Sequence, residues 1–138
     1  MDKKNGITGI VVVCHNRKLA EELINFSREM QHAEFAIENG GGTGTESYGT
    51  NPEIIMEAVR KADSGNGVLI FVDLGSAIMS TEIALEMLAG ETEARIADVP
   101  LIEGLISAVA GNFPGVTLDE LEKTAIESKT YSKLAPRK

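Results

Sequence analysis

The fold of this chain is decided by the stretch Ile10-Val11-Val12-Val13-Cys14-His15-Asn16. Four β-branched residues in a row predict a buried strand, and Asn16 is a typical N-cap for the amphipathic pattern that follows. We therefore expect His15 at the carboxyl end of a strand and beside a helix N-terminus. In an open α/β sheet ligands bind at that edge, and helix N-termini attract anions.

The bulk composition predicts one globular domain. The chain has 138 residues, 43% of them hydrophobic, and a formal net charge of -8. This charge disfavours nucleic acid or an anionic membrane as a partner and suits a protein with a basic docking face. Cys14 is the only cysteine, which is typical of a reducing compartment. The N-terminus has no signal-peptide pattern and no segment is long enough to cross a membrane, so we expect a cytoplasmic protein.

Apolar runs alternate with helical patterns along the chain, which favours a doubly wound, mostly parallel four-stranded sheet flanked by helices. The expected strands are residues 7–13, 33–38, 68–72 and 95–99. The expected helices are residues 17–30, 52–62, a segment after Ser76, 101–109, and a last helix that starts at the capping box of Thr117 and Glu120.

The helical periodicity also predicts which side chains are buried. On the first helix these are Leu19, Ala20, Leu23, Ile24, Ser27 and Met30; on the helix after Ser76 they are Ile83, Met87 and Leu88. We expect a single domain over residues 1–138, with a core of about 7–127 and a polar, basic C-terminal tail of about 128–138.

Two strand ends carry residues suited to work together. His15 follows the first strand and Asp73 follows the strand 68–72, and the carboxyl ends of parallel strands lie at one edge of the sheet. A carboxylate that accepts a hydrogen bond from Nδ1 fixes the imidazole tautomer and leaves Nε2 unprotonated. His15 is thus a candidate nucleophile and Asp73 its orienting group.

Two segments near this edge are candidate phosphate binders. Gly75 and Ser76 start a helix, where backbone N–H groups are free. The glycine-rich stretch 39–50 is longer than an ordinary α/β connection, which favours a functional loop. It offers further N–H groups at Gly42 and Gly49 and hydroxyls at Thr43 and Thr50.

Each feature also has a purely structural interpretation. A histidine at a strand end commonly packs or caps, an aspartate such as Asp73 commonly caps a turn, and glycines give mobility. Their convergence at one edge is what favours catalysis. With two histidines and one cysteine we expect no metal site, and the glycine-rich stretch lacks the lysine of a P-loop, so we expect no cofactor.

At these residues the chain resembles the mannose-type EIIA domains of the phosphoenolpyruvate-dependent phosphotransferase system. The resemblance is carried by His15, the Gly-Gly-Thr loop with Gly49-Thr50, the run Gly67-Val68-Leu69-Ile70-Phe71-Val72-Asp73-Leu74-Gly75-Ser76-Ala77, and Pro100-Leu101-Ile102-Glu103-Gly104. It extends from about Gly9 to Leu121. Leu74-Gly75-Ser76 after the aspartate, with no tryptophan in the chain, is more similar to the dihydroxyacetone kinase branch than to the sugar-transport branch.

The resemblance implies a sheet of strand order 2-1-3-4, a homodimer and a phosphohistidine carrier. His15 would accept phosphate on Nε2 from HPr and pass it to ADP bound on the DhaL subunit of the kinase. Asp73 would orient the ring, while Gly42, Thr43, Gly49, Thr50, Gly75 and Ser76 would face the phosphate. Relatives with fused HPr-like domains are longer than this chain, so we expect its donor to be a separate protein.

Three other functions remain open at this point. A sugar-specific EIIA would pass the phosphate to an EIIB partner. A receiver-like regulator would be phosphorylated on Asp73, although the first strand ends without the acidic residues that receivers gather around a metal. A small-molecule binding domain would hold an anion and transfer nothing.

Overall fold

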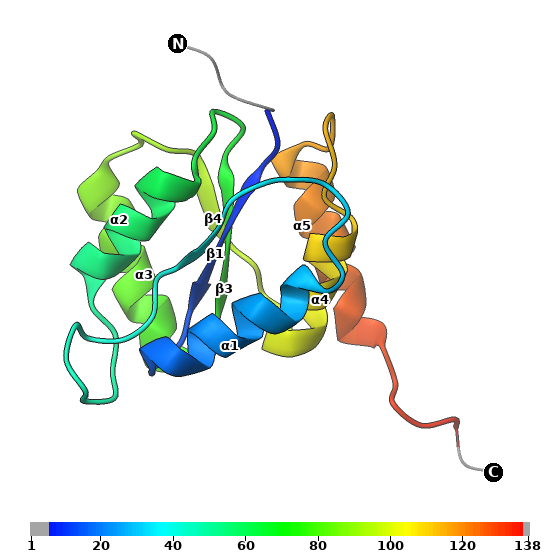
Figure 1. Ribbon diagram of the computed structural model, residues 1–138, viewed down its shortest axis with the longest axis horizontal. Coiled ribbons are helices and arrows are strands. Elements are labelled where there is room, and N and C mark those ends of the chain that lie inside the picture. The colour runs from blue at the N-terminus through cyan, green and yellow to red at the C-terminus, as the bar shows by residue number, and fades with distance from the viewer. Residues whose placement is uncertain (1–5, 137–138) are drawn as a thin grey trace.

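A computed structural model describes residues 6–136 and shows an α/β fold (Figure 1). The elements in chain order are β1 (Gly9–Val13), α1 (Arg17–Arg28), β2 (Ile37–Asn39), α2 (Pro52–Ala62), β3 (Val68–Val72), α3 (Gly75–Leu88), β4 (Ala94–Ile96), α4 (Leu101–Ala110), α5 (Leu118–Ile126) and the 3₁₀ turn η1 (Glu127–Thr130). The four strands form one parallel sheet in the order β2-β1-β3-β4, which confirms the predicted topology. From β1 the chain passes to β2 on one side and then crosses to β3 on the other side of β1. The topological switch point, where ligands bind in such sheets, therefore lies between the carboxyl ends of β1 and β3.

The sheet lies between two layers of helices (Figure 1). Alternate residues of each strand point to opposite faces, so Ile10 and Val12 pack with α1, α4 and α5, whereas Val11 and Val13 pack with α2 and α3. All four side chains are fully buried. Burial on both faces explains why β1 is an unbroken apolar run and not an alternating one.

The strand boundaries differ from the prediction mainly at the two outer strands. β2 starts at Ile37 and not at Ala33, because the carbonyls of Ala33 and Phe35 accept hydrogen bonds from the Gln31 side chain and not from a neighbouring strand. β4 spans Ala94–Ile96, whereas the prediction was 95–99. β1 starts at Gly9, two residues later than expected, and β3 matches the prediction.

The helix starts follow from their caps. The Asn16 side chain accepts from the Leu19 N–H, Asn51 accepts from the Glu53 N–H, and Thr117 forms the predicted capping box with Glu120. These caps fix where α1, α2 and α5 begin. α3 is different, because its N-cap residue Leu74 makes no side-chain capping bond.

Several residues predicted to be buried are exposed. On α1, Leu19 is 48% exposed, while Ala20, Ile24 and Ser27 are buried as expected. Met30 is 43% exposed and lies past the end of α1 at Arg28, two residues short of the predicted helix end. On α3, Ile83 and Met87 are 47% and 48% exposed, because Ala77, Thr81, Ala84 and Leu88 form the buried stripe. Periodicity alone does not distinguish an apolar face that packs on the sheet from one that remains uncovered. Both helices therefore present apolar side chains to solvent.

In the described part of the chain, residues 6–136, no helix combines the length and the apolar character that crossing a bilayer requires.

Candidate phosphoryl-transfer site

His15 lies just past the carboxyl end of β1 and is held by Asp73, which lies just past the end of β3. The His15 Nδ1 atom is 2.8 Å from Asp73 Oδ1, and the His15 backbone N–H donates to Asp73 Oδ2, also at 2.8 Å. The His15 and Asp73 side chains are 24% and 13% exposed. The carboxylate therefore fixes both the ring and the backbone of His15, and the predicted meeting of these residues is observed.

The position of Asp73 follows from the sheet register. Val13 pairs with Val72, and the Asp73 N–H donates to the Val13 carbonyl at 3.1 Å, so the pairing of β1 with β3 continues one residue past the strand. The Leu74 N–H donates to Asp73 Oδ1 at 2.7 Å. Asp73 therefore has both of the roles considered for it: it caps a local turn and it orients the His15 ring.

The hydrogen bond to Asp73 sets the tautomer of the ring. A carboxylate only accepts, so in the neutral imidazole the proton lies on Nδ1 and Nε2 keeps its lone pair. The Nε2 atom faces the hydroxyl of Ser76, which donates to it. The ring nitrogen that could attack phosphorus is therefore unprotonated and lies at the start of α3.

The first turn of α3 offers the donors expected of an anion site. Gly75 and Ser76 are its first residues, where backbone N–H groups have no partner inside the helix. A Cβ added to Gly75 would meet no atom within 4 Å, so the space around it is open. Ser76 and Gly75 therefore lie where a phosphoryl group on Nε2 would need hydrogen-bond donors.

The glycine-rich loop lies beside the site, but its predicted donors are used within the protein. The Gly42 N–H donates to the Cys14 carbonyl at 3.0 Å and the Gly49 N–H donates to the His15 carbonyl at 2.8 Å. The Thr43 hydroxyl bonds to Thr45 and Ser47, and the Thr50 hydroxyl lies 2.6 Å from Ser80 Oγ. Gly42 and Gly49 thus fasten the loop to the two residues that follow β1, and Thr50 fastens it to α3, whereas Thr43 bonds within the loop.

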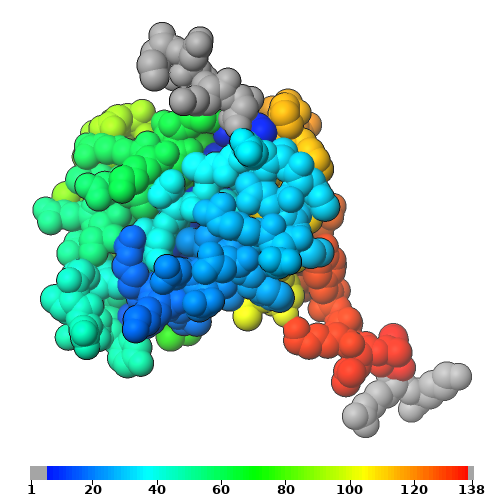
Figure 2. Space-filling model, in the orientation of Figure 1, coloured from blue at the N-terminus to red at the C-terminus, as the bar shows by residue number. Residues whose placement is uncertain are grey.

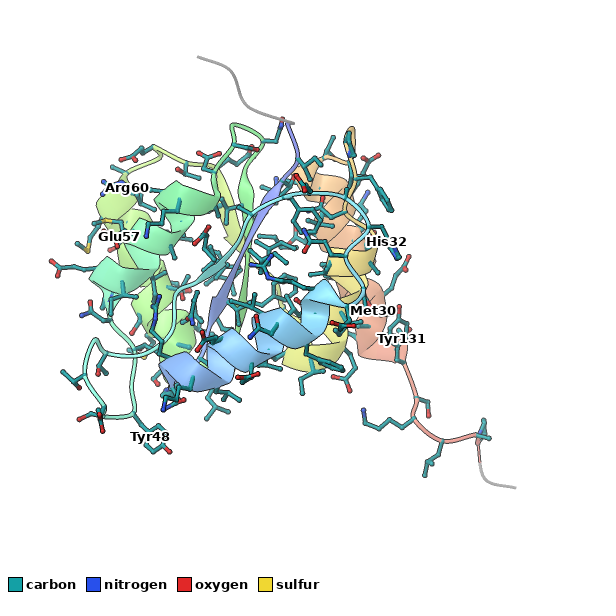
Figure 3. All side chains as sticks on the ribbon, viewed as in Figure 1. Met30, His32, Tyr48, Glu57, Arg60 and Tyr131 are labelled. Carbon is teal, nitrogen blue, oxygen red and sulfur yellow. The ribbon has the colours of Figure 1, made fainter. Side chains whose placement is uncertain are left out.

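Ser80 is a contributor that the sequence analysis missed. It lies one turn after Ser76 on α3, and its hydroxyl ties Thr50 to that helix. The i, i+4 spacing of the two serines, which puts both on one helix face, is the signal that could have found it. Tyr48, at the outer end of the loop, is 80% exposed and points away from the molecule (Figure 3).

Cys14 precedes His15 but points into the core on the α1, α4 and α5 side. Burial, with the charge of Asp73 as a smaller cause, raises the pKa of its thiol to about 12. The thiol is therefore neutral and not nucleophilic at ordinary pH. Within residues 6–136, no group of three or more His, Cys, Asp or Glu side chains is arranged to hold a metal ion.

A parallel sheet with a carboxylate-held histidine at its switch point, beside a helix N-terminus, defines a class of protein suited to phosphoryl transfer. The EIIA-man family model, described as the PTS system fructose IIA component, matches residues 9–121. The chain belongs to this family.

Several curated relatives carry the name DhaM. The chain is 39% identical over 101 residues to the phosphoryl donor subunit DhaM of dihydroxyacetone kinase 2 from Listeria innocua. This match covers 72% of this chain and 81% of that protein. The phosphotransferase subunit DhaM from Lactococcus lactis is 35% identical over 123 residues, covering 86% and 97%. The DhaM subunit from Escherichia coli is 32% identical over 120 residues, and the match covers 83% of this chain but only 25% of that protein. The chain thus spans about a quarter of the length of this last relative.

Two solved structures share the fold. A protein of unknown function, EF1359, has a TM-score of 0.74 and 29% identity, covering 89% of this chain and 97% of its own. A sigma-54 interaction domain protein from Enterococcus faecalis has a TM-score of 0.64 at 17% identity, which supports the fold alone.

Proposed function

We propose that this protein is a phosphohistidine carrier that accepts a phosphoryl group on Nε2 of His15 and transfers it onward. The observation that carries the proposal is the His15–Asp73 pair, with Nδ1 held at 2.8 Å and Nε2 turned to the start of α3. Membership of the EIIA-man family supports the same chemistry. The relatives named as phosphoryl donor subunits of a dihydroxyacetone kinase support the pathway.

The first half-reaction follows from the tautomer. The Nε2 lone pair attacks the phosphorus of a phosphorylated donor, the Nε2–P bond forms, and the donor's own P–N bond breaks with its electron pair left on the donor nitrogen. The His15 ring becomes positively charged while its Nδ1 proton stays in place, and the Asp73 carboxylate 2.8 Å away stabilises that charge. Onward transfer reverses these roles.

Ser76 has to change partner during this step. Its hydroxyl donates to Nε2 in the resting site, and attack requires that the lone pair be released. The freed hydroxyl is then close enough to donate to a phosphoryl oxygen, together with the backbone N–H groups of Gly75 and Ser76. Such fixed donors stabilise the charge of the transferring group.

The proposed donor is HPr, and the proposed acceptor is ADP bound on a DhaL-type subunit, whose product ATP then serves a kinase for dihydroxyacetone. The names of the relatives favour this acceptor. The proposal includes a homodimer and a cytoplasmic location, both implied by the family, and sedimentation of the purified protein tests the first.

A second acceptor has one specific observation in its favour. The matching family is described as a fructose IIA component, which favours phosphate transfer to an EIIB partner of a sugar transporter. Phosphorylated protein mixed separately with DhaL–ADP and with EIIB decides between the two. Loss of the phosphate only to EIIB would replace the kinase assignment and leave the carrier chemistry intact.

The carrier chemistry is tested by intact mass spectrometry after incubation with phosphoenolpyruvate, enzyme I and HPr. We expect a gain of one phosphate that mild acid removes and that His15→Ala abolishes. Undiminished labelling of the variant would overturn the proposal. Labelling that hydroxylamine removes would indicate an acyl phosphate on a carboxylate such as Asp73 and a receiver-like protein.

A further inference from the structure

The glycine-rich loop, residues 40–50, is tied to the phosphoryl-transfer edge only at its two ends. Its middle, residues 44–48, is exposed, and the hydroxyls of Thr43 and Thr45 bond to other atoms of the loop itself. Figure 2 shows the loop, in cyan-green, protruding at one corner of the molecule next to the start of α1 in blue. The position of the loop therefore depends on the contacts that its end residues make.

The second end of the loop contacts two different parts of the site. The Gly49 N–H donates to the His15 carbonyl at 2.8 Å, and the half-buried Thr50 hydroxyl lies 2.6 Å from the half-buried hydroxyl of Ser80 on α3. Thr50 also forms an isolated β-bridge with Gly42, at the other end of the loop. In residues 6–136 the Thr50–Ser80 bond is the only hydrogen bond between residues 40–50 and α3.

The start of α3 needs such a lateral restraint. Its N-cap residue Leu74 makes no side-chain capping bond, and its first residue is Gly75, which has wide conformational freedom. The buried Ala77 anchors the first turn on the side that packs on the core. Ser76 and Ser80 share another side of the helix because they are four residues apart. A bond from Ser80 to the loop therefore restrains the side of α3 that carries Ser76.

Together these contacts form a closed chain that begins and ends at His15. Asp73 accepts from the His15 backbone N–H at 2.8 Å, and α3 begins two residues after Asp73. Ser80 of α3 bonds to Thr50, and the neighbouring Gly49 returns to the His15 carbonyl. The N–H and the C=O of the same residue are thus held by two separate segments. The Thr50–Ser80 bond joins those segments to each other.

We propose that Ser80 is a positioning residue for phosphoryl transfer. Through Thr50 it holds α3 against the loop, and so fixes Ser76 and the first N–H groups of α3 relative to Nε2 of His15. The inference rests on the proposed function, because donors must be in place before the phosphoryl group arrives if they are to stabilise its transfer. Ser80 acts through its neighbours, since its hydroxyl bonds to Thr50 and the ring bonds to Ser76.

The test uses two phosphoryl donors, because a misplaced site should slow both. Phosphorylation of His15 is measured against the concentration of phosphorylated HPr and, separately, with phosphoramidate, a small donor that releases ammonia as its P–N bond breaks. Ser80→Ala removes the hydroxyl. Ser107→Ala on α4 is the matched control, since Ser107 is also half-buried and its hydroxyl donates to the Tyr131 hydroxyl at 3.4 Å.

We expect Ser80→Ala to lower the maximal rate with both donors about five- to tenfold, and to change the half-saturating HPr concentration by about twofold or less. Ser80→Thr keeps a hydroxyl and should restore the rate, while Ser107→Ala should not alter it. Equal maximal rates for Ser80→Ala and Ser107→Ala would overturn the proposal. An effect of Ser80→Ala on the half-saturating HPr concentration alone would place Ser80 in a contact with the donor, and would also overturn it.

A double-substitution cycle shows whether Ser80 acts through Thr50. The variant with both Ser80→Ala and Thr50→Val should react at the rate of Ser80→Ala alone, because both substitutions remove the same bond. A Thr50→Val variant far slower than Ser80→Ala would assign the Thr50 hydroxyl to the phosphoryl group itself and overturn the link.

Amide hydrogen exchange tests the link without any donor. The Gly49 N–H should exchange faster in Ser80→Ala than in the unmodified protein, because the loop loses its bond to α3. Unchanged exchange would overturn the proposal. Failure of both donors on the unmodified protein would instead refute the proposed function.

Discussion

The ring of His15 depends on one carboxylate for both its direction and its protonation state. An amide at position 73 could either accept from Nδ1 or donate to it, and donation would move the ring proton to Nε2. We therefore predict that Asp73→Asn folds normally and is phosphorylated about 10–100 times more slowly. Rapid-quench labelling with HPr measures this rate.

The control for that variant is Asp63→Asn. Asp63 accepts a hydrogen bond from the Gly65 N–H in a turn after α2, at the opposite edge of the sheet. The Asp63→Asn variant should be phosphorylated at the rate of the unmodified protein. A normal labelling rate for Asp73→Asn would show that Asp73 only caps the turn, through the hydrogen bond that it accepts from the Leu74 N–H.

Cys14 gives a second prediction at the residue scale. Its pKa is raised from 9.0 to about 12 in the folded protein, so between these values the unfolded chain loses a proton that the folded one keeps. The free energy of unfolding should then fall with rising pH across this window, by at most about 1.4 kcal/mol per pH unit. Below pH 9 this group should contribute no pH dependence.

Urea unfolding between pH 8 and 11 measures the effect of Cys14 as the difference between the unmodified protein and Cys14→Ala, because other groups also titrate there. We expect the unmodified protein to lose more stability over this range. Parallel pH profiles for the two proteins would contradict the assigned burial of the thiol.

At the scale of elements, the contact of β1 with α2 leaves no room for a side chain. A Cβ added to Gly9 would collide with the backbone carbonyl of Ala62, at the end of α2. We predict that Gly9→Ala destabilises the fold by about 1–3 kcal/mol or more, since backbone atoms cannot turn aside. Thermal unfolding measures this loss, with Gly75→Ala as the control that has open space. Similar melting temperatures for both variants would show that β1 and α2 are less closely packed.

The elements also show what the sequence could and could not predict. β1, β3 and the caps at Asn16, Asn51 and Thr117 were predicted because each is specified by local chemistry: burial of an apolar run, or a side chain bonding its own backbone. β2 and β4 are three residues each and are specified by pairing with distant strands, so their ends were misplaced. The exposed faces of α1 and α3 were missed because both helices carry more apolar residues than the core accepts.

The candidate site also has one part that the sequence predicts and one part that it does not. His15 and Asp73 were predicted to meet because parallel strands place their ends at one edge. The partners of the loop were not predictable in this way. Gly42 and Gly49 bond to the carbonyls of Cys14 and His15, and Thr50 bonds to Ser80, through a loop path that no local pattern specifies.

At the scale of the whole molecule, the net charge should govern how fast a donor arrives. A chain of charge -8 attracts a partner with a basic face over distances that salt screens. We predict that the second-order rate of phosphorylation by HPr falls several-fold between 50 and 500 mM salt, while the rate with phosphoramidate changes little. Stopped-flow or rapid-quench labelling gives both rates. A salt-independent HPr rate would contradict electrostatic guidance of the donor.

The most direct test of the account asks which atom carries the phosphate. Protein with ¹⁵N-labelled histidine is phosphorylated with phosphoenolpyruvate, enzyme I and HPr, and NMR then identifies the ring nitrogen bonded to phosphorus. We predict Nε2 of His15, with Nδ1 still protonated and bonded to Asp73. Phosphate on Nδ1, on His32 or on a carboxylate would contradict the account.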